Sequence, residues 1–270
     1  MLRVTTLALA TTVAAFDALA QTPASRAVDC GGNSPTSGEV VRVIDGRSFL
    51  LADGREVRLA AIEAPLPVAG DEDEARVAAA LAARTALEAL VFHREVSLRP
   101  LGVLDRYGRL IAYAFIQTPS GETLVQRALL AGGQTLMSPT PLAASCRTSL
   151  QNAEREARTG KLGLWADSYY AVKRADSPAD VLAEQGRFAL VEGRVASVRE
   201  NGGVVYMNFG GRQSEQFTVT LAKRNEGIFK SAGLTLKALT GRVVEVRGWV
   251  EERSGPAIEV IRPEQIEIVN

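Results

Sequence analysis

The stretch that decides the fold is residues 43–67, which read VIDGRSFLLADGREVRLAAIEAPLP. Runs of β-favouring residues predict strands at 40–44, 48–51 and 56–62, and Asp53-Gly54 is a hairpin turn signal between the last two. A second stretch, Asp105-Arg106-Tyr107-Gly108-Arg109, contains a turn just before another predicted strand at 110–116. Arginines and carboxylates therefore accompany the predicted strands.

The residues around these stretches predict a small barrel with added helices. An Ala/Leu-rich run at 74–91 has strong helix propensity, and 95–101 has the character of a strand. Residues 123–131 and 145–159 predict two more helices, the second stopped by Gly160. Five short strands with three helices are what a small OB-type five-stranded barrel needs. We therefore expect an α+β domain, mainly β, over residues 38–168.

The two quoted stretches resemble the active-site strands of the staphylococcal nuclease (thermonuclease) family, whose pattern is V-I-D-G-D-T, R-L-x-x-I-D-x-P-E and D-x-Y-G-R. The resemblance implies that Arg58 and Arg109 bind the scissile phosphate and stabilise its developing charge. It also implies that Glu63 is the second calcium carboxylate and that Asp45 is at best a remote member of the metal site. Gly163-Leu164-Trp165 is similar to the segment that closes the family's domain.

Two positions depart from the family pattern. Arg47 stands where the family has its first calcium carboxylate, and Leu66 stands where it has the glutamate that acts as general base. A hard cation wants several oxygen ligands, and losing a general base costs on the order of 10²–10⁴-fold in rate. We therefore expect a catalytically impaired member without a cofactor, which binds Ca²⁺ only if the altered site is active.

The residues that remain predict a site for anions. We expect Arg47, Arg58 and Arg109 to converge, with Glu63 as the only opposing carboxylate and Arg47 paired with it. Such a pocket keeps a positive surplus and planar donor forks that suit phosphate or carboxylate. The alternative is an Arg47–Glu63 ion pair that only stabilises the barrel. The sequence also leaves open a working phosphodiesterase, with a carboxylate supplied from the acidic residues 71–74, and a structural or protein-interaction module of the cell envelope.

The second half of the chain predicts another barrel. Residues 169–185 are polar without a clear period and predict a linker, and residues 186–270 predict a five-stranded OB-like domain. Its expected strands are 188–199, 204–209, 216–222, 242–251 and 257–269, with a short helix at 225–232. Period-two alternation places Trp249 on a polar strand face with Glu245 and Arg247, and Tyr206 on a face with Asn208. Trp249 and Tyr206 are therefore candidate platforms for stacking bases, or else they pack against a neighbouring strand or the first domain.

The N-terminal residues 1–20 predict a signal peptide, because a short positive start precedes an apolar run too short to span a bilayer and Ala18-Leu19-Ala20 follows. A polar lead-in continues over 21–37, and no later stretch is apolar for long enough to cross a membrane. We therefore expect an exported protein, in a bacterial periplasm or outside the cell. There Cys30 and Cys146 would usually form one disulfide, with free thiols or a bond between chains as the alternatives.

The charge balance limits the choice of partner. Lys+Arg and Asp+Glu both number 31, so the formal net charge is zero. Dedicated nucleic-acid binders usually have a basic excess, because phosphate neutralisation dominates their affinity. We therefore expect only weak binding of a phosphate-bearing ligand or of single-stranded nucleic acid, and the sequence identifies no protein partner.

Overall fold

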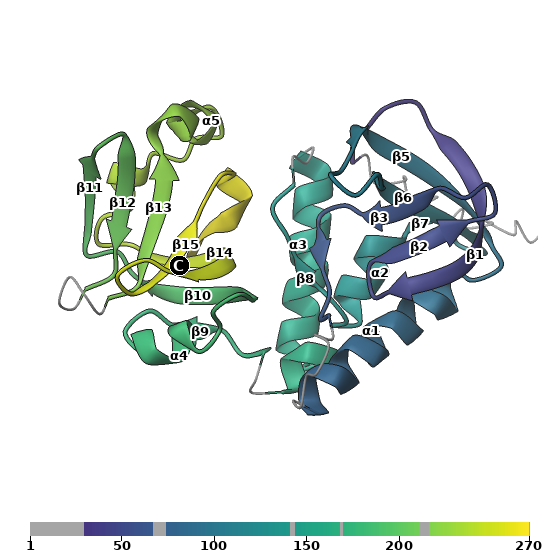
Figure 1. Ribbon diagram of the computed structural model, residues 1–270, viewed down its shortest axis with the longest axis horizontal. Helices are drawn as coiled ribbons and strands as arrows, with labels where there is room; N and C mark the ends of the chain where they lie inside the picture. Colours follow the sequence, from purple (N-terminus) through teal and green to yellow (C-terminus); the bar gives the residue numbers. More distant parts are fainter. Residues whose placement is uncertain (1–29, 67–73, 141–143, 168–169, 211–215, 270) are drawn as a thin grey trace, which may run out of the picture.

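The computed structural model describes residues 30–66, 74–140, 144–167, 170–210 and 216–269. The predicted signal peptide at 1–20 and the acidic residues 71–73 lie outside the described residues. Figure 1 shows two lobes, one built by the first half of the chain and one by the second. In the described ranges, no helix is both long enough and apolar enough to cross a bilayer.

The first lobe contains a closed five-stranded barrel. Its strands are β1 (Thr36–Asp45), β2 (Ser48–Leu51), β3 (Glu56–Leu59), β5 (Glu95–Leu104) and β6 (Leu110–Thr118), and β7 (Gly121–Leu124) extends the sheet beyond β6. The first half of β1 pairs with β5 and its second half pairs with β2. A parallel pairing of β3 with β6 closes the barrel. The predicted OB-type architecture is therefore present.

Three helices cover this barrel and complete its core. They are α1 (Glu74–Val91), α2 (Val125–Ala131) and α3 (Ala144–Thr159), followed by the short η1 (Gly163–Ala166). The fully buried aromatic side chains Phe49, Tyr113 and Phe115 belong to the same apolar cluster as Leu87 of α1 and Leu129 of α2. Burial of such side chains supplies most of the driving force for the fold.

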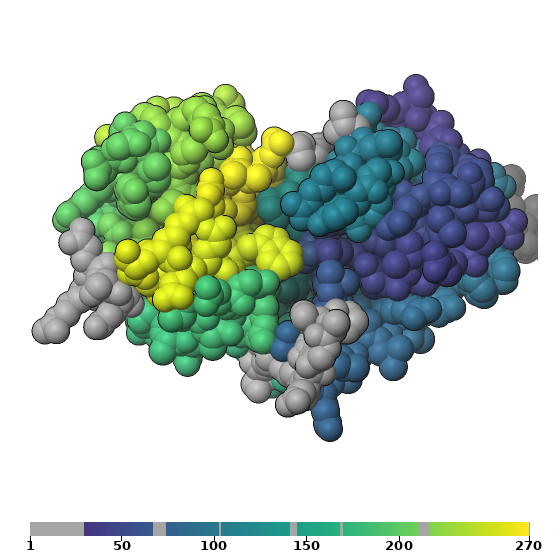
Figure 2. Space-filling model, in the orientation of Figure 1, coloured from purple at the N-terminus to yellow at the C-terminus, as the bar shows by residue number. Residues whose placement is uncertain are grey.

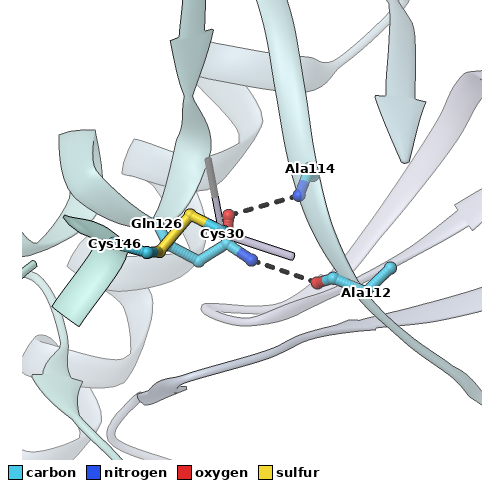
Figure 3. The surroundings of a disulfide bond; sticks show 5 residues. All are labelled: Cys30, Ala112, Ala114, Gln126 and Cys146. Atoms are coloured by element: carbon cyan, nitrogen blue, oxygen red, sulfur yellow. Dashed lines mark hydrogen bonds between the residues drawn. A yellow bond between two sulfur atoms is a disulfide. The ribbon is translucent and has the colours of Figure 1, made fainter. Parts of the chain in front are cut away.

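A disulfide joins Cys30, at the start of the described chain, to Cys146 on α3. Figure 3 shows Gln126 of α2 beside it. The buried Gln126 side chain donates a hydrogen bond of 3.1 Å to the carbonyl of Ala112 and accepts one of 3.3 Å from the amide of Ala114. The lead-in, two helices and β6 are therefore tied together on one side of the barrel.

The predicted strand at 56–62 is in fact two strands. β3 ends at Leu59, and β4 (Ile62–Glu63) leaves the barrel to pair with β8 (Leu136–Met137). The reason is Ala61, whose φ of 63° turns the backbone between them. The Ala61 amide donates to the Thr140 hydroxyl at 3.1 Å, and its carbonyl accepts from the Ser138 amide at 2.9 Å. Glu63 therefore lies on a separate two-stranded ribbon.

The second lobe repeats the strand order of the first. Its strands are β10 (Phe188–Arg194), β11 (Ser197–Asn201), β12 (Val204–Asn208), β13 (Thr218–Ala222), β14 (Val243–Glu252), β15 (Pro256–Glu259) and β16 (Ile266–Val269). β10 pairs with β14 and β11 pairs with β12. The consecutive strands β10 and β11 together therefore take the place that β1 has in the first barrel, where one half pairs with β5 and the other with β2. β13 pairs parallel with β15, as β3 does with β6. The prediction of a second OB-like barrel agrees with this order, although the expected strands 188–199 and 257–269 are each split in two.

Short helices connect the strands of the second lobe. Between β13 and β14 lie η3 (Lys223–Asn225), α5 (Glu226–Ser231) and η4 (Leu236–Leu239), and η5 (Pro263–Gln265) separates β15 from β16. The expected linker at 169–185 also contains structure, namely β9 (Lys173–Arg174) and α4 (Pro178–Leu182). β9 pairs parallel with β10, and Val181 is fully buried in the second core. Much of this segment thus belongs to the second lobe.

The two lobes meet along α3. Figure 2 shows the C-terminal strands, in yellow, packed against the first half of the chain. Four ion pairs join α3 to the second lobe: Arg147–Glu264 at 2.7 Å, Arg247–Glu154 at 2.8 Å, Arg155–Glu267 at 3.1 Å and Arg158–Glu245 at 2.6 Å. Arg247, at the centre of this contact, is only 4% exposed in its side chain.

Candidate functional site

The candidate site is built around Glu63 of β4. Arg47 is the last residue of the turn from β1 to β2, where its amide donates a 2.9 Å hydrogen bond to Asp45 Oδ1. The Arg47 guanidinium forms an ion pair with Glu63 Oε1, and Arg58 Nη2 of β3 lies 2.9 Å from Glu63 Oε2. The side chains of Arg47 and Glu63 are only 8% and 7% exposed. Both carboxylate oxygens of Glu63 are therefore bound by arginines in a largely dry environment.

Arg109 is held by a different carboxylate. Its Nε and Nη2 lie 2.8 Å and 2.7 Å from Asp105 Oδ2, in the turn between β5 and β6. Asp105 Oδ1 also accepts the backbone N–H groups of Tyr107 and Arg109. The guanidinium carbon of Arg109 lies 5.0 Å from the ring centroid of Tyr107, within the range of a cation–π contact. The turn thus fixes the position of the Arg109 guanidinium group, and the Arg109 side chain is 15% exposed.

The three guanidinium groups lie close enough to repel one another. Burial, followed by the charge of Arg58 and less strongly that of Arg109, lowers the pKa of Arg47 to about 10, against the raising effect of Asp45. Burial and then Arg109 also lower the pKa of Arg58. Arg47 and Arg58 thus share Glu63, and Arg109 lies near enough to act on the charge of both.

The expectation that Glu63 is the only opposing carboxylate is wrong. Asp105 pairs with Arg109, and Asp45 acts on both Arg47 and Arg58. Glu56 of β3 also lies 4.0 Å from Arg109 Nη1, so at least four carboxylates of the described residues oppose the three guanidinium groups. The site has no clear positive surplus, and its affinity for an anion must come from donor geometry. Arg47 Nε is buried and has no hydrogen-bond partner among the described residues, and Arg58 is 27% exposed in its side chain.

The residues present do not suit a calcium ion. Calcium takes six to eight oxygen ligands, whereas both oxygens of Glu63 are engaged by guanidinium groups. Asp45 uses Oδ1 to hold the Arg47 amide. No group of three or more His, Cys, Asp or Glu in the described part of the chain is arranged to hold a metal ion. Leu66, which has no group to accept a proton, lines a cavity beside Glu63.

The structure does not bring the two aromatic candidates of the second lobe together in one pocket. Trp249 is 50% exposed, packs edge-to-face on Phe188 with ring centroids 6.2 Å apart, and lines the cavity that borders Glu63. Tyr206 is half-buried on β12, opposite Thr220, and is not part of that cavity's lining. The polar face expected for Glu245 and Arg247 is buried against α3.

Three contributors escaped the sequence analysis. Asp105 sits four residues before Arg109, and that spacing is the sequence signal for the ion pair that the structure shows between them. β8 is two residues long and has no pattern of its own, although it pairs with the strand that carries Glu63. Glu154, 93 residues from Arg247 in the chain, accepts the Met137 amide of β8 at 2.6 Å and ties that ribbon to the second lobe.

A closed OB-type barrel with two arginines above a buried glutamate defines a nuclease-type domain. Residues 56–167 match the family model described as staphylococcal nuclease homologue. The chain is also similar to the micrococcal nuclease of Shigella flexneri, with 34% identity over 143 residues that cover 48% of this chain and 74% of that protein. The chain belongs to the staphylococcal nuclease family. Arg58, Glu63, Leu66 and Arg109 fall inside the matched range, and Arg47 precedes it.

Proposed function

We propose that the first barrel binds a phosphate-bearing ligand, a nucleic-acid strand or a fragment of one, through Arg47, Arg58 and Arg109. The observation that carries the proposal is the ion pair of the Arg47 guanidinium with Glu63. In this ion pair, the positively charged Arg47 side chain binds the Glu63 carboxylate, which the family pattern assigns to calcium. The barrel is therefore a binding domain that does not hydrolyse its ligand by a metal-dependent route.

The geometry favours phosphate for two reasons. Planar guanidinium forks match the oxygens of phosphate, and hydrogen bonds between charged groups are about twice as strong as neutral ones. Burial, and after it the mutual repulsion of the guanidinium groups, lowers the pKa of Arg47 and Arg58, and a phosphate near Arg58 and Arg109 relieves that repulsion. Because the neighbouring carboxylates offset the arginines, binding is weak and is best measured at low ionic strength, where screening is least.

The test compares cleavage with binding on the same preparations. Single-stranded DNA and RNA are incubated with the chain in calcium and in chelator, and binding of a labelled oligonucleotide is followed by anisotropy at low salt. We expect no cleavage, and binding that weakens at least about tenfold in the Arg58→Gln/Arg109→Gln double variant, since two charged contacts are lost. The matched control is Arg55→Gln/Arg253→Gln, which removes the same charge from exposed ion pairs.

Two results would overturn the proposal. Calcium-dependent cleavage that disappears in the Arg58/Arg109 variant would show that the site has been rebuilt as a working phosphodiesterase. Equal binding by that variant and by the control would leave the arginines as structural ion pairs. A complementary experiment restores the family pattern with Arg47→Asp and Leu66→Glu. We expect this variant alone to be stabilised against heat by calcium, because oxygen ligands replace a guanidinium beside Glu63.

We also propose that the chain is exported. The disulfide between Cys30 and Cys146 supports this, since such bonds persist in oxidising compartments. N-terminal sequencing of the protein recovered from the periplasm or medium of an expressing bacterium should begin near Gln21. Recovery of uncleaved chain in the cytoplasm alone would contradict export.

A further inference from the structure

A cavity of about 210 Å³ lies between the two lobes. Its walls come from β4 and the residues after it, including Glu63 and Leu66, and from the second lobe, including Phe188 and Trp249. Pockets for drug-sized ligands measure about 300–1,000 Å³. The cavity is therefore the size of a single ring system rather than of a large ligand.

The larger part of the cavity wall is apolar and suits a flat ring, although charged side chains, Arg76 and Lys173 among them, also line it. Leu66, Leu136 and Leu164 line the cavity together with Phe188 and Trp249. Trp249 packs edge-to-face on Phe188, lines the cavity and remains 50% exposed, so part of its indole is open to a ring placed there. Aromatic side chains of this kind bind nucleobases by stacking, without selecting a particular base.

The cavity also adjoins the arginines. Glu63 lines it, and the same carboxylate is ion-paired with Arg47 and Arg58. A ligand that combines a planar ring with a phosphate can therefore place one group on each side of Glu63. Leu66 lets the ring enter without burying a charge, because it presents methyl groups where the family pattern has a glutamate.

We propose that the cavity receives the base of a nucleotide whose phosphate binds at the arginines, and that Trp249 is the stacking surface. This inference rests on the proposed function and assigns its ligand class. It makes the second lobe part of the binding site, because the first lobe supplies the charged groups and the second supplies the ring's partner.

The test uses calorimetry with adenosine 5′-monophosphate, ribose 5-phosphate and inorganic phosphate as probes. We expect adenosine 5′-monophosphate to bind about 5- to 150-fold more tightly than ribose 5-phosphate, the range of one base–aromatic stack. Trp249→Leu should remove that advantage and leave ribose 5-phosphate unaffected. Tyr206→Leu, which alters an aromatic residue of the same barrel outside the cavity lining, should change neither affinity.

A second variant guards against a structural effect of replacing Trp249. Leu66→Trp fills the cavity from the first lobe and should abolish the advantage of the base while phosphate still binds. Equal affinities for the two sugar phosphates, or an advantage that survives both substitutions, would overturn the inference while the proposed function stands. Failure of all three probes to bind would overturn the proposed function as well.

Discussion

Arg247 is the residue whose replacement tests the contact between the lobes most directly. Its Nη1 donates to Glu154 Oε2 at 2.8 Å and to the Met137 carbonyl at 3.1 Å, and its Nη2 donates to Glu245 Oε1 at 3.0 Å. Burial alone would lower the pKa of Arg247, but Glu154 and Glu245 outweigh it and raise the pKa. The guanidinium therefore stays charged, and its environment is built for that charge.

Replacement of Arg247 by Met keeps the apolar part of the side chain and removes both its charge and its three hydrogen bonds. Removing one partner of a buried ion pair costs about 3–5 kcal/mol, because the other charge stays buried. Here Glu154 keeps the Met137 amide and Glu245 keeps Arg158. We therefore expect Arg247→Met to lower the free energy of unfolding by about 3 kcal/mol, the lower end of that range.

Urea unfolding followed by tryptophan fluorescence measures this change, since Trp165 and Trp249 report on the first and second lobes. The control is Arg253→Met, which breaks ion pairs just beyond the end of β14, the strand of Arg247, at a side chain that is 47% exposed. Exposed pairs contribute about 0–1 kcal/mol, so this variant should unfold almost like the parent. If Arg247→Met unfolds within about 1 kcal/mol of the control, the buried network does not hold the lobes together and the reasoning fails.

Three further outcomes are expected. Gly46→Ala places a methyl group 2.6 Å from the Ala83 methyl group on α1 and should lower the free energy of unfolding by about 1–3 kcal/mol. The control Gly227→Ala meets no atom within 4 Å, so its free energy of unfolding should stay within about 1 kcal/mol of the parent. Equal losses in thermal or urea unfolding would contradict the packing argument. Replacing Cys30 and Cys146 by Ser opens a loop with a sequence separation of 116 and should cost up to about 5 kcal/mol; an unchanged melting temperature would oppose this. Burial would raise the pKa of Asp105, but hydrogen bonds from the arginine four residues on lower it. The stabilisation by the Asp105 carboxylate is thus present above the unfolded pKa of about 4 and is lost as pH falls through the lower folded value. The free energy of unfolding of Asp105→Asn should therefore fall less steeply with decreasing pH than that of the parent. Equal slopes for the variant and the parent would refute the assignment.

The parts of the fold that follow from local pattern were predictable. The helix expected at 74–91 has those bounds in the structure, because an uninterrupted Ala/Leu-rich run needs no tertiary information to be recognised. The break after Leu59 was not predictable, since Ala61 adopts a positive φ that its residue type does not indicate. Tertiary hydrogen bonds to Thr140 and Ser138 impose it.

The same distinction applies to the site. The three arginines could be named from the sequence because they stand at motif positions whose spacing survives there. The predicted positive surplus was wrong, because Asp105 pairs with Arg109 and Asp45 holds the Arg47 amide. The contact of Arg247 with Glu154 joins residues 93 positions apart and has no local signal at all.

The bent first strand of each barrel also sets an order of assembly during synthesis. β1 leaves the ribosome early and can pair with β2 at once, but its other half waits for β5, and closure waits for β6 at 110–118. The second barrel repeats this delay, since β10 waits for β14 at 243–252. A nascent chain shorter than this carries unpaired strand edges, which are templates for association with other chains. Each half of the molecule is therefore most vulnerable to aggregation just before its last strands emerge.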